Sequence, residues 1–266
     1  MKHIIAVASG KGGVGKSTVA SNLAVSLANT NVSDREKPLK VALIDVDFYG
    51  PSIPTLMGGG EIQVNPQGKF LPALRYNVKY VSIAFFLKNP DDPIIWRGPM
   101  FGKAINQLFT DVDWGDVDIC IVDMPPGTGD AQLSLSQMIS LSGVLMVTTP
   151  QEVALSDVRR AINMFRKVNV PVLGIIENMA GFVTDQGEEI NIFGKGGGEE
   201  LSKNYDIALL GSIPIDLNIG KGGDLGEPIA IVDGAKSAEI FNALAEKVIL
   251  AIDEQQQARS PLSVVN

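Results

Sequence analysis

Nine residues near the start of the chain, GKGGVGKST, have the types and spacing that can hold a phosphate chain. They fit the pattern G-x-x-x-x-G-K-[ST] and lie between a predicted strand at 3–9 and a predicted helix at 16–29. Glycines in such a loop let backbone N–H groups turn toward phosphate oxygens, and the helix N-terminus adds partial positive charge. Lys16 is expected to reach the β and γ phosphates of ATP, and the Ser17 hydroxyl is expected to bind Mg²⁺. The predicted nucleotide-binding residues of the loop are Gly10, Lys11, Gly12, Gly13, Val14, Gly15, Lys16, Ser17 and Thr18.

Two other segments place carboxylates where they could serve the same site. Asp123 ends the apolar run CIVD, and ligands of open α/β sheets bind beyond the carboxyl ends of strands, so it is predicted to hold magnesium, through water. Asp45 and Asp47 follow another apolar run, and their spacing of two puts both on one face of a strand. One is expected to orient the attacking water and the other to support it, and we favour Asp47 for the first role because it lies closer to the loop. The predicted magnesium ligands are Ser17, Asp47 and Asp123.

The elements that must position these residues form a regular alternation of short apolar runs and helical patterns. Strands are predicted at 3–9, 40–47, 78–86, 117–124, 143–149, 170–178 and 207–214. Helices are predicted at 16–29, 98–110, 131–141, 152–168, 196–204 and 235–253. The pattern predicts an α/β fold, a doubly wound and mostly parallel sheet with helices on both faces. Residues 1–266 are expected to form one domain with a mobile tail at about 254–266.

Three glycine- or proline-rich segments are predicted to be loops. Residues 50–77 and 179–198 are too rich in Gly, Pro and polar residues for long regular elements. The runs FGKGGG (193–198) and GKGGD (220–224) resemble phosphate loops but do not continue to G-K-[ST], so they are expected to be loops or helix entries.

Composition excludes several classes of protein. The net charge of −8 disfavours a general nucleic-acid binder, because affinity for the phosphate backbone needs clustered Lys and Arg. The single cysteine, Cys120, excludes an intrachain disulfide and is expected to be buried in a strand. No apolar run approaches the roughly 20 residues that span a bilayer. We expect a cytoplasmic protein with neither nucleic acid nor membrane as a partner.

Longer motifs bring out a family resemblance. KGGVGKST resembles the deviant Walker A motif of the MinD/ParA/nitrogenase-iron-protein class of dimeric P-loop ATPases. Within that class the chain resembles the Mrp/ApbC family of iron-sulfur cluster carrier ATPases, over positions 4 to about 230. The motifs that carry this resemblance are DVDFYGPSIPTLMG, WRGPM, WGDVDICIVDMPPGTGD, VTTPQEVALSDVRRAINMF, GIIENMAGF, IFGKGGGEELS and GSIPID.

The resemblance implies a homodimer that hydrolyses ATP to ADP and phosphate, slowly and only as a dimer. In that class the first lysine of the loop crosses to the partner's nucleotide, so Lys11 joins Lys16 and Asp47 as an implied catalytic residue. The alternative for Lys11 is a solvated loop lysine. The resemblance also implies that adenine is contacted by Asn178, Pro214, Ile215 and Asp216.

The chain departs from the family at the expected cluster ligands. Members that bind a bridging cluster have a C-P-x-C motif after the ENM stretch, whereas here Thr184, Asp185 and Gln186 stand in its place, with one residue fewer. Iron-sulfur clusters are held by Cys thiolates, with His the usual substitute, and this loop has neither. No iron-sulfur ligand is therefore predicted, and we expect the chain to hold no stoichiometric cluster.

Three functions follow as alternatives. The first is an ATPase for iron-sulfur cluster assembly or transfer, with client or scaffold proteins as partners. The second is a MinD/ParA-like positioning switch, although the C-terminal EKVILAIDEQQQARSPLSVVN is not the basic amphipathic helix that membrane anchoring needs. The third is a regulatory protein that binds nucleotide and hydrolyses it negligibly.

Overall fold

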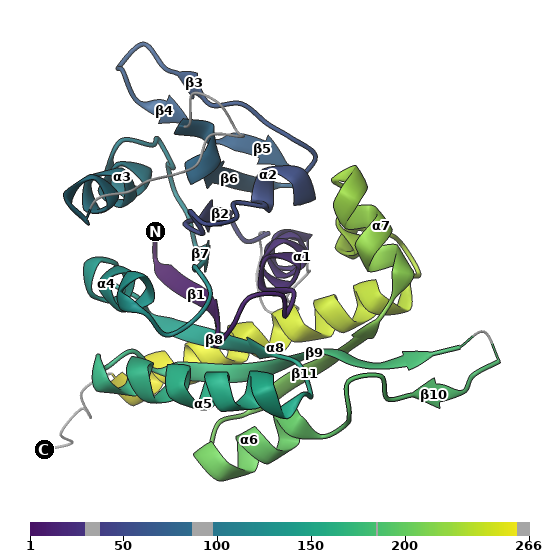
Figure 1. Cartoon of the computed structure of the whole chain (residues 1–266). Coiled ribbons are helices and arrows are strands. Elements are labelled where there is room, and N and C mark those ends of the chain that lie inside the picture. The colour runs from purple at the N-terminus through teal and green to yellow at the C-terminus, as the bar shows by residue number, and fades with distance from the viewer. Residues whose placement is uncertain (30–37, 87–97, 185, 260–266) are drawn as a thin grey trace, which may run out of the picture.

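The fold is built on a nine-stranded sheet, seen in the computed structural model, which describes residues 1–29, 38–86, 98–184 and 186–259. The sheet order is β10-β9-β8-β1-β7-β2-β6-β5, with β11 also paired to β9 (Figure 1). β5 and β10 pair antiparallel with their neighbours, and the other pairings are parallel. The strands are β1 (His3–Ser9), β2 (Val41–Asp45), β5 (Ala73–Arg75), β6 (Val78–Ser82), β7 (Ile119–Asp123), β8 (Gly143–Thr148), β9 (Val172–Val183), β10 (Glu189–Ile190) and β11 (Leu209–Ile215).

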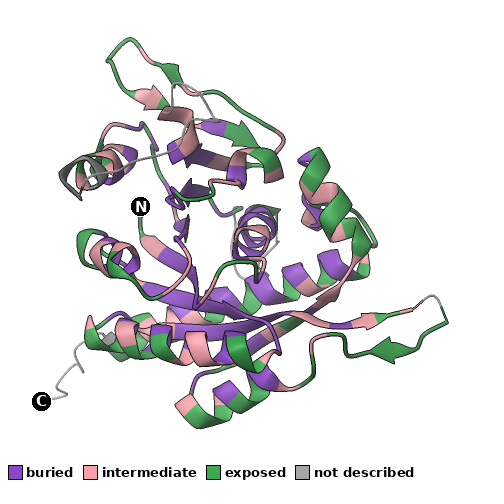
Figure 2. Cartoon of the chain, in the orientation of Figure 1, coloured by how far each residue is buried: buried purple, intermediate pink, exposed green. Residues whose placement is uncertain are grey.

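The central strands of this sheet are buried on both sides, because helices cover both of its faces (Figure 2). Alternate residues of β1 show the division: Ile5 and Val7 belong to the hydrophobic cluster on one face, and Ala6 and Ala8 to the cluster on the other. The first cluster includes residues of α1 (Lys16–Asn29), α2 (Ile53–Leu56), η2 (Ile229–Ile231) and α8 (Lys236–Arg259). The second includes residues of η1 (Ile83–Phe86), α3 (Gly98–Thr110), α4 (Asp130–Met138), α5 (Glu152–Lys167) and α6 (Gly197–Tyr205). The doubly wound fold class is confirmed.

Most predicted elements coincide with observed ones, and the differences lie at their ends. β1, α1 and α3 have the predicted bounds. β9 runs five residues beyond its predicted end, because its last residues pair with β10 and β11 of the same sheet. α8 continues through 254–259, where EQQQAR is rich in good helix formers, and residues 260–266 lie outside the described part of the chain.

The segment predicted to lack long elements contains only short ones. Residues 50–77 form α2, the two-stranded sheet of β3 (Gln63–Val64) and β4 (Phe70–Leu71), and β5. The run FGKGGG leads into α6, as a helix entry. GKGGD instead lies inside α7 (Leu217–Leu225), a helix without a buried residue. The motif WRGPM begins with residues 96–97, which lie outside the described residues.

Candidate nucleotide and magnesium site

The phosphate loop joins β1 to α1 at the carboxyl end of the sheet's centre (Figure 1). Its first turn is fixed by the Ser9 hydroxyl, which donates to the Lys11 carbonyl oxygen at 2.8 Å. Gly10 packs directly on α5, because a Cβ at this position would lie 2.2 Å from the carbonyl carbon of Asp157 and 2.4 Å from the backbone nitrogen of Val158. The start of the loop therefore rests on a helix backbone and has room only for glycine.

The end of the loop is held by β9. The Asn178 side-chain amide donates to the Val14 carbonyl oxygen at 2.8 Å, and Asn178 is buried. Gly15 has φ of +79°, and a Cβ there would lie 2.2 Å from the same amide nitrogen. Asn178, which the resemblance assigns to adenine, thus lies against the phosphate loop, and its contact with adenine stays a prediction.

Lys16 brings the two predicted carboxylate segments to the loop. Its Nζ lies 2.6 Å from Asp123 Oδ1 and 3.3 Å from Asp47 Oδ2. It also donates to the Ser17 hydroxyl at 3.3 Å. The structure therefore gathers the predicted phosphate lysine and all three predicted magnesium ligands at one point.

Burial and charge oppose one another in this group. Burial acts to lower the pKa of Lys16, but the charges of Asp123 and Asp47 outweigh it and hold that pKa above its ordinary value. Burial raises the pKa of Asp123, and the Lys16 ammonium opposes that rise. The cluster therefore keeps a firmly protonated lysine beside two buried carboxyl groups.

The oxygens present fit a magnesium ion. Asp123 Oδ2 is buried and has no hydrogen-bond partner among the described residues, so the site holds an unused acceptor. Mg²⁺ prefers oxygen ligands and is usually held by one or two carboxylates together with phosphates and water. Ser17, Asp47 and Asp123 supply that kind of set. The described part of the chain contains no group of three or more His, Cys, Asp or Glu side chains that could hold a metal, so this set of two carboxylates and a hydroxyl would rely on phosphate and water for its remaining ligands.

Asp45 has a different role from Asp47, and the prediction of one shared strand face is wrong. β2 ends at Asp45, whose Oδ1 accepts from the Asp47 backbone nitrogen at 3.0 Å and turns the chain. Its Oδ2 accepts from the Ile53 nitrogen at 3.2 Å and the Ser82 hydroxyl at 2.9 Å. Burial, with the charge of Asp123, raises the pKa of Asp45 to about 8. Asp45 thus anchors the segment that carries Asp47, while Asp47 itself faces Lys16.

Ser82 and Glu177 were not predicted from the sequence. Ser82 follows the apolar run of β6 and donates to Asp45, a position marked only by a polar residue at a strand end. Glu177 is buried next to Asn178 and accepts from the Gly198 nitrogen at 2.7 Å, which fixes the start of α6. A buried Glu inside an apolar strand was the available signal.

Lys11 contrasts with Lys16. Its side chain is half-buried, and its ammonium makes no hydrogen bond or ion pair with any described residue. The other predicted adenine contacts lie at the end of β11, where Ile213 pairs with Asn178. There Asp216 caps α7, accepting from the Asn218 nitrogen at 2.8 Å and the Ser237 hydroxyl at 2.6 Å.

The loop that stands in place of the family's C-P-x-C motif lies between β9 and β10 and is closed by hydrogen bonds to Thr184. The Gly187 nitrogen donates to the Thr184 carbonyl oxygen at 2.9 Å, and the Glu188 nitrogen to the Thr184 hydroxyl at 3.1 Å. Asp185 lies outside the described residues. Cys120 is fully buried in β7, where burial raises its pKa, so its thiol is not available at this turn.

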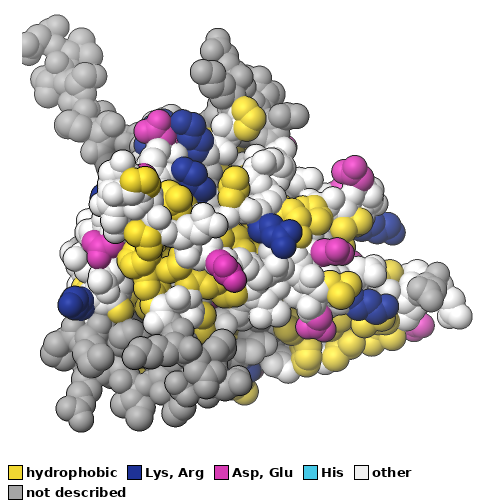
Figure 3. Space-filling model, turned by 90° about the horizontal axis from the view of Figure 1, so that it is seen from above, with side chains coloured by type: hydrophobic (Ala, Val, Ile, Leu, Met, Phe, Trp, Pro, Cys, Tyr) yellow, Lys and Arg dark blue, Asp and Glu magenta, His cyan; other side chains and the backbone are white. Residues whose placement is uncertain are grey.

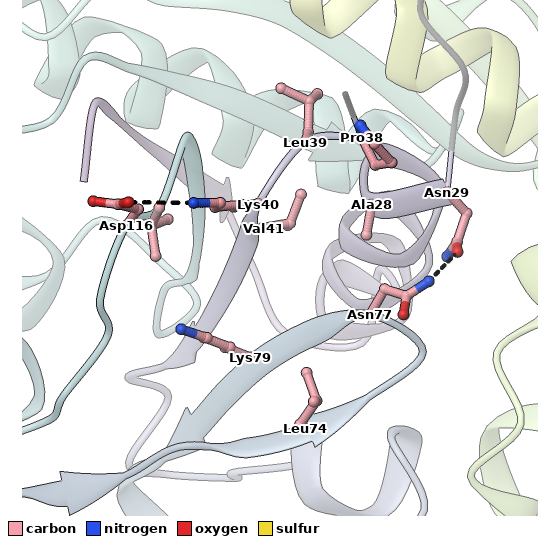
Figure 4. Close-up of a pocket in the computed structure, with 11 residues that line it drawn as sticks. Ala28, Asn29, Pro38, Leu39, Lys40, Val41, Leu74, Asn77, Lys79 and Asp116 are labelled. Carbon is pink, nitrogen blue, oxygen red and sulfur yellow. Dashed lines mark hydrogen bonds and ion pairs between the residues drawn. The ribbon is translucent and has the colours of Figure 1, made fainter. Parts of the chain in front are cut away.

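A cavity of about 560 Å³ lies at the amino ends of β2 and β7, whereas the loop follows the carboxyl end of β1; Figure 4 shows the residues that line the cavity. Asp116 pairs with Lys40 at its rim, and the Asn77 side-chain amide donates to Asn29 across it. The cavity contains none of the predicted nucleotide or magnesium residues.

The surface seen in Figure 3 carries basic and acidic side chains singly and intermixed, with hydrophobic ones between them. Within the described ranges, no helix is long and apolar enough to cross a membrane.

Comparison with known proteins agrees with this geometry. The family model named ParA and described as NUBPL iron-transfer P-loop NTPase matches residues 1–249. The chain belongs to this family of P-loop NTPases. An iron-sulfur cluster carrier protein of Aquifex aeolicus is 50% identical over 96% of this chain and 69% of its own length. A mitochondrial iron-sulfur protein of Arabidopsis thaliana, required for NADH dehydrogenase, is 45% identical over 97% of this chain and 81% of its own.

A solved structure also supports the fold. The nucleotide-binding protein of Archaeoglobus fulgidus in complex with ADP superposes with a TM-score of 0.72 at 39% identity, covering 85% of this chain and 86% of that one. The resemblance to iron-sulfur cluster carriers of the MinD/ParA class is confirmed.

Proposed function

We propose that this chain binds Mg-ATP at the loop from Gly10 to Thr18 and hydrolyses it to ADP and phosphate. The convergence of one buried lysine, one hydroxyl and two carboxylates beside a helix N-terminus carries this proposal; the residues are Lys16, Ser17, Asp47 and Asp123. Lys16 supplies charge to the β and γ phosphates, and Asp47, held by Asp45, orients the attacking water. Ser17, Asp47 and Asp123 would hold a Mg²⁺ ion, which would supply positive charge against the negative charge that develops on the phosphates. The ADP complex of the A. fulgidus relative supports the choice of nucleotide.

Hydrolysis is proposed to need two copies of the chain. Lys16 pairs with Asp123 and Asp47 of its own chain, whereas the Lys11 ammonium makes no hydrogen bond or ion pair with a described residue of that chain. Lys11 would then stabilise charge on the nucleotide of the partner, as an arginine finger does.

Phosphate release over a range of protein concentrations tests both statements. Turnover per chain should rise with concentration until dimers saturate. Lys11→Ala should keep ATP binding but lose turnover, as expected for a group that acts mainly in the transition state. Lys40→Ala removes an exposed lysine at the other end of the sheet and is the matched control. A flat rate per chain, together with an active Lys11→Ala, would exclude hydrolysis across a dimer.

The biological role proposed is iron-sulfur cluster assembly or transfer in the cytoplasm, with client or scaffold proteins as partners. Membership of the iron-transfer family and the names of the relatives support it. Because the loop has Thr184, Asp185 and Gln186 in place of C-P-x-C, this chain would either assist transfer without those ligands or act as a regulatory switch that carries no cluster. Cluster insertion into an apo-ferredoxin from a loaded scaffold protein, with and without this chain and ATP, separates these roles. An ATP-dependent acceleration supports transfer, and no effect supports the switch.

A further inference from the structure

The ammonium of Lys16 lies among the oxygens that are predicted to hold magnesium. Its three neighbours are Asp123 Oδ1 at 2.6 Å, Asp47 Oδ2 at 3.3 Å and the Ser17 hydroxyl at 3.3 Å. The Lys16 side chain is only 5% exposed, so water contributes little to the solvation of its charge. The Lys16 ammonium therefore contacts the same oxygens that are predicted to bind Mg²⁺.

The two carboxylates need such a cation. Asp123 is fully buried and Asp47 is 7% exposed. Burying an ionised carboxylate without a counter-charge has a large desolvation free energy, and removing one partner of a buried ion pair leaves the other charge uncompensated. Among the ion pairs of the described residues, Lys16 is the cation that contacts both carboxylates. The lysine thus supplies the counter-charge that these two carboxylates contact in the described part of the chain.

Lys16 cannot serve carboxylates and phosphates fully at the same time. A lysine ammonium has three N–H donors, and three acceptors surround it here: two carboxylate oxygens and one hydroxyl. To donate to the β and γ phosphates it must release at least one of these partners. Mg²⁺ needs oxygens at about 2.0–2.1 Å, and a second cation on the same oxygens repels it. The metal and the lysine therefore compete for Asp123 and Asp47.

We propose that Lys16 is an internal counter-ion that excludes divalent metal from the site until nucleotide phosphates draw its ammonium away. This rests on the proposed binding of nucleotide at the loop. It sets an order in which the metal enters with the nucleotide or after it. Asp123 Oδ2, which has no hydrogen-bond partner among the described residues, and the oxygens that Lys16 leaves are then available to the metal together.

Titration of Mn²⁺ into the nucleotide-free full chain, followed by electron paramagnetic resonance, tests the proposal. Lys16→Gln should bind one Mn²⁺ per chain at least tenfold more tightly than the unaltered chain. Lys16→Arg keeps the charge, and Lys11→Gln removes a charge from the same loop without touching the carboxylates, so neither should gain metal affinity. Adding Asp123→Asn to Lys16→Gln should abolish the gain. Equal Mn²⁺ affinity of the unaltered chain and Lys16→Gln overturns the proposal.

A second measurement tests the proposal if Lys16→Gln is too unstable for the titration. If Lys16→Gln unfolds readily, millimolar Mn²⁺ should restore its cooperative thermal transition and should leave that of the Lys16→Gln/Asp123→Asn variant unchanged. A melting curve of Lys16→Gln that does not respond to Mn²⁺ counts against the inference. No nucleotide is present in either experiment, so ATP that fails to bind the unaltered chain refutes the proposed function separately.

Discussion

Replacing Gly10 by Ala should destabilise the chain through a clash with a helix backbone. The added Cβ would lie 2.2 Å from the Asp157 carbonyl carbon and 2.4 Å from the Val158 nitrogen, far inside normal contact distance. Neither atom can move as a side chain can, so either the loop or α5 must shift. Overpacking of this kind costs about 1–3 kcal/mol, and the upper part of that range applies because both atoms are backbone.

The matched control is Gly12→Ala in the same loop. Its Cβ would meet nothing closer than 3.9 Å, at Pro126, and Gly12 does not need a left-handed backbone. Gly12→Ala is a control for stability only.

For Gly10→Ala, a loss of about 2–3 kcal/mol in the free energy of unfolding corresponds to a melting temperature about 4–12 °C lower for a domain of this size.

Thermal unfolding followed by circular dichroism measures the difference. We expect Gly10→Ala to melt well below the unaltered chain and Gly12→Ala to melt within about 2 °C of it. ATP affinity should fall in Gly10→Ala, because the displaced loop no longer presents its N–H groups correctly. If Gly10→Ala melts with Gly12→Ala, the close packing of the loop on α5 is wrong.

Three further outcomes are expected. Asn178→Ala leaves the Val14 carbonyl without its donor, and the loss of about 1–2 kcal/mol should weaken ATP binding about 5- to 30-fold by calorimetry; unchanged affinity would contradict the role of this bond. Anaerobic reconstitution with iron and sulfide should give no stoichiometric cluster, because buried Cys120 offers a dimer two thiolates where a [4Fe-4S] cluster takes four; about four irons per dimer would refute this. The hydrogen bonds from Lys2 and Lys40 hold the pKa of Asp118 below its ordinary value, so their stabilisation is present above about pH 4 and is lost as the pH falls through the folded value. Asp118→Asn should therefore lower the free energy of unfolding by about 0.5–1 kcal/mol at pH 7, by urea denaturation, and by less at pH 3; an equal loss at both would count against it.

The loop and its flanking elements could be predicted from the sequence because their determinants are local. The apolar run that ends at Ser9 and the glycine-lysine pattern that follows fix β1, the loop and the start of α1 within a few residues of chain. Asp123 could be predicted equally well, because it is a carboxylate at the end of an apolar strand. Long, strongly patterned elements of this kind leave few alternatives.

The arrangement around Asp45 depends on residues far apart in the chain and could not be predicted. β2 ends where it does because Asp45 accepts from the Asp47 and Ile53 nitrogens and from Ser82, which is 37 residues away. Spacing alone suggested a continuing strand, with both carboxylates on one face.

The helix α7 also depends on tertiary contacts. Each glycine inside a helix costs about 1 kcal/mol relative to Ala, so GKGGD favours a loop on propensity alone. Asp216 caps the helix, and a Cβ at Gly223 would lie 3.0 Å from a Leu56 methyl, so this turn of α7 packs closely on α2. These contacts outweigh the local preference.

Calorimetric titration of Mg-ATP into the unaltered chain and Lys16→Ala tests the central claim most directly. Lys16 is the residue on which the phosphate site, the carboxylates and the metal order all depend. The account predicts one ATP bound per chain in the unaltered protein, severely weakened binding in Lys16→Ala, and unaltered binding in the exposed control Lys40→Ala. Equal ATP affinity in the unaltered chain and Lys16→Ala would contradict it.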